Sequence, residues 1–261
     1  RFHAWLMPDY NRPAALYWWT GVVLGVAVAS YSVVQVAGMP ASSRVLILAG
    51  AMIAMLAGLF PVRIPGSKNA FAAGEIFMFL LLLLFGPSAA ALAAAGEALL
   101  GSWRTSKRWT SRIISPSIAA LSMYGTGALL HLLLDKLRGA ELYNEGMLII
   151  ATMLFSMAYF IVNTFMISAV PKLKRGEPLE LSALFGVFGW VGLAYAGSSA
   201  LASLLFLTYR TSGIVVLAGV VPVLATLLVA LHFAFRQQEV NVAAQLAAEE
   251  AAAREAAAQE R

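Results

Sequence analysis

Long apolar blocks, separated by short polar segments, dominate the chain. They are longer than the alternating runs of half-buried strands, and their lengths are typical of helices that lie in lipid. We predict helices over residues 14–37, 44–60, 74–86, 87–102, 113–134, 147–170, 182–208 and 213–235. The expected fold is an all-α integral membrane protein with about eight transmembrane helices, because helices satisfy their own backbone groups in lipid.

The third and fourth blocks are the shortest, and only Gly86-Pro87 separates them. Proline suits the first turn of a helix, so the pair predicts a short helical hairpin that turns at Gly86. The third helix, at about 13 residues, would be about 20 Å long against a hydrocarbon core of about 30 Å.

Composition supports a membrane protein and excludes several functions. Charged residues make up 12% of the chain and hydrophobic residues 61%, whereas soluble domains carry about 25% charged residues. The chain has no cysteine, which excludes disulfides and thiolate metal sites. It also has none of the common phosphate-binding, serine-hydrolase or zinc-protease motifs. We therefore expect no enzyme activity, no cofactor and no metal within these residues. Since the chain begins with Arg1 rather than Met, we expect that its start is trimmed.

The basic residues predict an orientation. If both termini are cytoplasmic, eleven Lys and Arg residues before the tail fall on the inner side and four on the outer side, as the positive-inside rule requires. The loop 103–112 contributes most, with Arg104, Lys107, Arg108 and Arg112. We interpret it as a topology anchor, and contact with anionic lipid or a partner domain is the alternative. The predicted location is a bacterial inner membrane, and the net charge of +5 needs no nucleic acid to explain it.

Aromatic residues cluster at the predicted span ends. Their amphipathic rings favour the membrane interface, so we interpret them as anchors: Tyr17, Trp18, Trp19, Trp103 and Trp109.

One irregular segment interrupts the apolar pattern. Residues 61–74, PVRIPGSKNAFAAG, contain two prolines and a polar run that no regular helix would hold. Irregular backbone at membrane depth is tolerated only where protein or a water-filled cavity shields it. We therefore expect this segment to line a polar pocket or a protein–protein contact.

Two carboxylates belong to the same unit. Glu75 lies eleven residues before Gly86 and Glu97 eleven after it, so an antiparallel hairpin would place them at nearly the same depth. Intramembrane carboxylates usually face the bundle interior or an aqueous cavity. The functional hypothesis is a ligand or ion site built from Arg63, Lys68, Asn69, Glu75 and Glu97. The alternative is structural: Glu75 stabilises its helix N-terminus, and Glu97 forms a salt bridge.

Asn163 lies in the middle of the predicted helix 147–170. An interhelical hydrogen bond is the favoured interpretation, with a ligand contact as the alternative.

From Arg236 the composition changes to Ala, Glu, Gln and Arg, which are strong helix formers. We divide the chain into a transmembrane domain at 1–235 and a cytoplasmic helical connector at 236–261. Val242 and Leu246 begin a thin apolar stripe that suits a two-helix coiled coil, hence a homodimer; a lone solvated helix is the alternative. The sequence stops within this pattern, so we expect the connector to lead to a segment outside the chain.

The stretch 60–116 resembles the N-terminal membrane sensor regions of bacterial signalling proteins. The matching features are the turn VRIPG, the segment FMFLLLLLFGP with its hairpin, and the basic loop SWRTSKRW. In those proteins a bundle of about eight helices precedes a GGDEF, HD-GYP or histidine-kinase output domain. The resemblance implies an input module for cyclic-dinucleotide or phosphotransfer signalling, although no output domain is present in these residues.

The same hairpin pattern is also similar to the substrate-binding S components of energy-coupling factor transporters. Those proteins bind vitamins or metal ions within a small helical bundle. The charged tail and the predicted eight helices, rather than six, depart from that pattern.

The leading hypothesis is a membrane-embedded sensor or regulatory module. A ligand, a lipid or a partner membrane protein would bias the helices around 61–103, and the C-terminal helix would carry the change to a cytoplasmic output. A small-molecule uptake component and an accessory subunit of a membrane complex are the alternatives.

Overall fold

The computed structural model describes residues 10–58, 62–63, 70–71, 74–177 and 182–216, with scattered positions between 218 and 245. Its helices are α2 (Arg12–Ala37), α3 (Ala41–Gly58), α4 (Glu75–Phe85), α5 (Pro87–Thr105), α6 (Trp109–Gly139), α7 (Glu145–Arg175) and α8 (Ser182–Ser212). Two two-residue strands, β1 (Val62–Arg63) and β2 (Ala70–Phe71), pair antiparallel within the irregular segment. The prediction of an all-helical fold is confirmed apart from this short pairing.

Four of the described helices are long and apolar enough to cross a membrane: α2, α6, α7 and the Val191–Ser212 part of α8. Two shorter apolar helices, Ala41–Ala57 and Glu75–Phe85, accompany them. Large apolar side chains lie on outward faces, as Leu16 (72% exposed) and Val34 (68%) do on α2, where lipid would cover them. A membrane protein is therefore supported, and the prediction of eight crossings stays a prediction.

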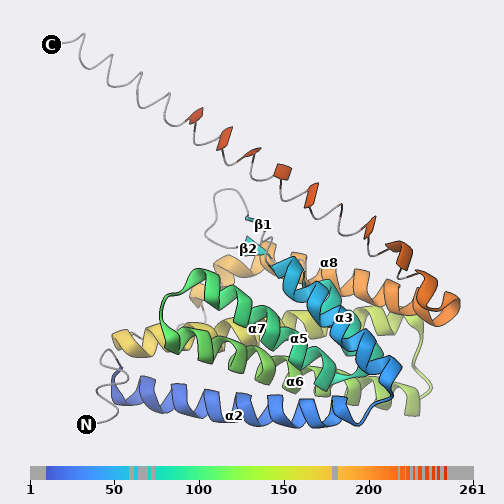
Figure 1. Cartoon of the computed structure of the whole chain (residues 1–261), viewed down its shortest axis with the longest axis horizontal. Helices are drawn as coiled ribbons and strands as arrows, with labels where there is room; N and C mark the ends of the chain where they lie inside the picture. The colour runs from blue at the N-terminus through green and yellow to red at the C-terminus, as the bar shows by residue number, and fades with distance from the viewer. Residues whose placement is uncertain are drawn as a thin grey trace.

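The helices pack as a bundle around α4. Figure 1 shows α2 along one long side and α8 along the opposite side, with α5, α6 and α7 between them. Helix α4 packs against α3, α5 and α8, and every side chain from Glu75 to Leu83 is buried. An apolar helix that is buried all round is a core helix, so this short element is enclosed by protein rather than by lipid.

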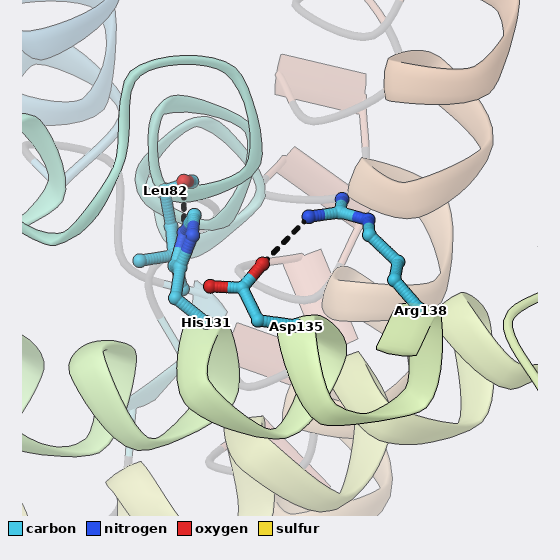
Figure 2. Close-up of polar contacts among 4 residues, drawn as sticks. All are labelled: Leu82, His131, Asp135 and Arg138. Carbon is cyan, nitrogen blue, oxygen red and sulfur yellow. Dashed lines mark hydrogen bonds and ion pairs between the residues drawn. The ribbon is translucent and has the colours of Figure 1, made fainter. Parts of the chain in front are cut away.

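The hairpin between α4 and α5 turns at Gly86, as predicted. Gly86 has φ +88°, which residues with a Cβ rarely adopt, and Pro87 begins α5. The Gly86 amide donates a hydrogen bond to the Leu82 carbonyl oxygen at 2.9 Å. The same carbonyl accepts a second hydrogen bond from His131 Nε2 of α6 at 3.1 Å (Figure 2). Since a carbonyl only accepts, Nε2 carries the proton.

Three hydrogen bonds gather the start of α2, the start of α6 and the end of α7 at one end of the bundle. Asn11 Nδ2 donates to Leu173 O at 2.6 Å, and the Tyr17 hydroxyl donates to Met166 O at 2.9 Å. Trp18 Nε1 donates to Thr110 O at 3.0 Å.

The interpretation of Trp18 as an interface anchor is wrong. Trp18 is 1% exposed and packs in an apolar cluster with Ile114 and Ile118. A tryptophan with its N–H satisfied by protein is stable inside a core. Trp19, Trp103 and Trp109 are exposed, and Tyr17 is half-buried. For these four residues the interpretation as anchors stays a prediction.

Candidate functional site

Glu75 is the first residue of α4, and its side chain is 4% exposed. A negative charge is favoured at a helix N-terminus, but Gly74 before it supplies no side-chain cap. Oε2 of Glu75 has no hydrogen-bond partner among the described residues. A buried carboxylate oxygen without a partner is costly, so this atom is a candidate ligand contact.

Glu97 of α5 lies beside the start of α4. A methyl group at Gly74 would be 2.9 Å from Glu97 Oε1 and 2.5 Å from the Ala54 carbonyl oxygen of α3. The two carboxylates also interact electrostatically. The structure therefore brings Glu75 and Glu97 to one level of the bundle, as the equal spacing from Gly86 predicts.

Two tyrosines complete the group. Tyr159 of α7 is 3% exposed, and its ring centroid lies 6.1 Å from that of Tyr195 of α8. Both phenols interact electrostatically with Glu75 and with Glu97. We call these four residues the carboxylate cluster. It joins four different helices, so a group bound there would contact α4, α5, α7 and α8 together.

Aromatic rings pack against the apolar side of the carboxylate cluster. The Phe79 ring lies 6.2 Å from each of the Tyr159 and Tyr195 rings, and Phe155 packs edge-on against Phe79 at 5.7 Å. Phe160 lies 4.9 Å from Tyr195. Such rings exclude water and present partly negative faces, which attract cations.

The cluster offers acceptor oxygens in a low-dielectric setting. Neither carboxylate forms an ion pair with a basic residue in the described part of the chain. No three potential metal-ligating side chains gather in that part either. Two carboxylates and two phenols can bind an organic cation or a ligand that donates hydrogen bonds, or they can share a proton.

The other predicted site residues fall in different places. The Arg63 backbone lies in β1, but its side chain, like all of Lys68 and Asn69, is outside the described residues. Asn163 lies one turn beyond Tyr159 on α7, and its Oδ1 accepts a hydrogen bond from Ser122 of α6 at 3.1 Å. Its amide thus holds two helices together, as the favoured interpretation has it.

The basic loop between α5 and α6 is described. Arg104, Lys107 and Arg108 are exposed. Arg112 Nε donates to Ser106 O at 3.0 Å, and its guanidinium lies 5.0 Å from the Trp103 ring centre. Of the predicted output residues, Val242 and Leu246 lie outside the described part of the chain.

Sequence reasoning missed Tyr159 and Tyr195. Both lie in the middle of apolar blocks. A tyrosine hydroxyl there needs a hydrogen-bond partner within the protein, and this need could have indicated that the two residues belong to a polar site. The sequence does not show which way a helix is rotated, and that rotation decides whether such a hydroxyl faces the carboxylates.

Comparison of the chain with protein-family models, with curated proteins and with solved structures found no match.

Proposed function

We propose that this chain is a membrane-embedded sensor module whose ligand binds at the carboxylate cluster. The observation that carries the proposal is Oε2 of Glu75, buried without a partner among the described residues. Ionisable groups inside a membrane domain are expensive and usually functional. A ligand with a positive charge or hydrogen-bond donors would satisfy this oxygen.

A structural ion pair would need a basic side chain at bonding distance from Glu75 or Glu97. The ion pairs of the described residues, Arg138–Asp135 and Arg175–Glu177, lie elsewhere at exposed positions. Stabilisation of the α4 N-terminus explains a negative charge at Glu75. It does not explain why a second carboxylate and two tyrosines surround that charge.

The position of Tyr195 supports a route to the output. Tyr195 belongs to α8, which ends at Ser212 and leads through Gly213 (φ +71°) to the helical positions beyond it. Tyr195 hydrogen-bonds the Glu75 side chain, so a ligand bound at Glu75 would alter this contact and favour one position of α8 over another. Such differential contact is what shifts a conformational equilibrium.

The number of crossings, the side of the termini and the role of the connector are proposed from the resemblance to bacterial sensor regions and from the charge pattern. We propose eight crossings, both termini in the cytoplasm and a bacterial inner membrane, because basic residues gather in the loops that this arrangement places inside. The connector 236–261 would pair with that of a second copy or join a signalling output domain. Any catalytic activity would belong to that output.

Paired spin labels test whether the cluster is coupled to α8. The chain has no cysteine, so Leu204→Cys on α8 and Val34→Cys on α2, both exposed, can be labelled without further changes. Glu75→Gln removes the charge as a bound cation would. We expect the distance distribution in nanodiscs to shift by about 2 Å, a typical helix displacement.

Glu145→Gln is the matched control for this experiment. Glu145 is also the first residue of a helix, but it is exposed. Its variant should reproduce the unsubstituted distribution. If Glu75→Gln also left the distribution unchanged, the sensor proposal would be wrong. A purified protein that retains a vitamin-sized ligand without any α8 displacement would instead support the uptake component.

A further inference from the structure

A cavity of about 260 Å³ lies between the first turns of α6 and the last turns of α7. It is separate from the carboxylate cluster and shares no residue with it. Arg108, Thr110 and Ser111 line it from the start of α6, and Lys174 lines it from the end of α7.

The lining changes from charged to apolar along both helices in the same direction. On α6 it runs from Arg108 through Ser111 and Ser115 to Ile118, and on the antiparallel α7 from Lys174 back to Ile167. One end of the cavity is therefore lined by cationic side chains and the other by apolar side chains. Ile167 is 38% exposed, so the apolar end reaches the outer surface of the helices, where lipid would cover it.

The residues around the cationic end predict that it lies at the level of the membrane interface. The start of α2, the start of α6 and the end of α7 meet there. Trp19, Trp103 and Trp109 are exposed near these helix ends, and such rings sit at headgroup depth. The α6 N-terminus adds a partial positive charge, and Lys174 lies 4.4 Å from the Tyr10 ring centre, so its ammonium group is held at the cavity.

We propose that this cavity binds one anionic phospholipid. The lipid phosphate would lie between Arg108 and Lys174, within reach of the Ser111 hydroxyl. The first part of one acyl chain would follow Ser115 toward Ile118 and Ile167. The charged end recognises a phosphate, whereas the apolar end requires that the phosphate carry a hydrocarbon chain. The inference does not depend on the carboxylate cluster.

Native mass spectrometry of the purified, delipidated protein tests the proposal. The protein in detergent would be titrated with phosphatidylglycerol, with phosphatidylcholine and with inorganic phosphate in separate series. We expect one phosphatidylglycerol to bind in preference to phosphatidylcholine. Lys174→Gln should weaken that binding about fivefold, the effect of one basic residue at an anionic membrane surface. Lys136→Gln, at the exposed far end of α6, should leave it unchanged.

A second variant keeps the charges and fills the apolar half. Ser115→Leu should reduce phosphatidylglycerol binding at least as much as Lys174→Gln, because the acyl chain and the new side chain compete for the same space. Binding of inorganic phosphate as tight as that of the lipid would overturn the proposal. So would equal binding of both lipids, or an equal loss in Lys174→Gln and Lys136→Gln.

Discussion

At the scale of single residues, the proposed ligand site depends on the buried carboxylate of Glu75. Its carboxylate is buried, has Glu97 beside it, and leaves Oε2 without a partner among the described residues. Proteins retain such an arrangement at functional sites, where the cost of desolvation is recovered when a ligand binds.

Glu75→Gln should leave the free energy of unfolding of the ligand-free protein unchanged or slightly higher, because a neutral amide of the same shape replaces a poorly satisfied carboxylate. Thermal unfolding in detergent measures this, with Glu145→Gln as the exposed control. A loss of about 3 kcal/mol or more would show that Glu75 is half of a buried ion pair and contradict the account.

Gly74 lies where α3, α4 and α5 approach one another. Gly74→Ala would place a methyl group 2.5 Å from the Ala54 carbonyl oxygen and 2.9 Å from Glu97 Oε1. We expect it to lower stability by about 1–3 kcal/mol, as overpacking does. Gly101→Ala on α5 meets no described atom within 4 Å and should be neutral or stabilising, since alanine favours helix. Equal effects of the two changes in thermal unfolding would contradict this packing.

At the scale of elements, the sequence predicts most of what the structure contains. The apolar blocks predict the helices to within a few residues over the described range, and Gly86-Pro87 predicts the hairpin, because these features depend on local chemistry. The rotation of each helix about its axis does not depend on local chemistry. It is set by packing between distant segments, so the meeting of Tyr159 and Tyr195 with the carboxylates could not be predicted. Nor could the contact between His131 and the Leu82 carbonyl.

That contact fixes the end of α4 opposite Glu75. His131→Ala should lower stability by about 1 kcal/mol, the typical net value of one hydrogen bond; the Leu82 carbonyl keeps its bond from the Gly86 amide. Lys136→Ala, on the exposed face of α6, is the control for helix composition. If both variants melted at the unsubstituted temperature, His131 would not be holding α4 in place.

At the scale of the whole molecule, we predict the orientation in the membrane from the charge pattern. Helix α6 has 31 residues and is therefore about 46 Å long, enough to cross a hydrocarbon core of about 30 Å. The basic loop before it and the short turn after it should lie on opposite sides. This prediction depends on the charge pattern of the loops.

Single cysteines measure the orientation directly. In intact cells, a membrane-impermeant maleimide should label Leu142→Cys, which follows α6, and should not label Lys107→Cys, which precedes it. Lys107→Cys should react once the membrane is opened. Labelling of Lys107→Cys in intact cells would reverse the orientation that we propose.

A density map of the protein purified from its own membrane, at a resolution that shows side chains, tests the central claim most directly. We predict density from a bound group, not from the chain itself, within hydrogen-bonding distance of Glu75 Oε2 and close to Tyr159 and Tyr195. If Oε2 were instead paired with a basic side chain of the protein, such as Arg63 or Lys68, with no additional density in the cluster, the carboxylate cluster would be a structural ion pair. The proposed ligand site would then be wrong.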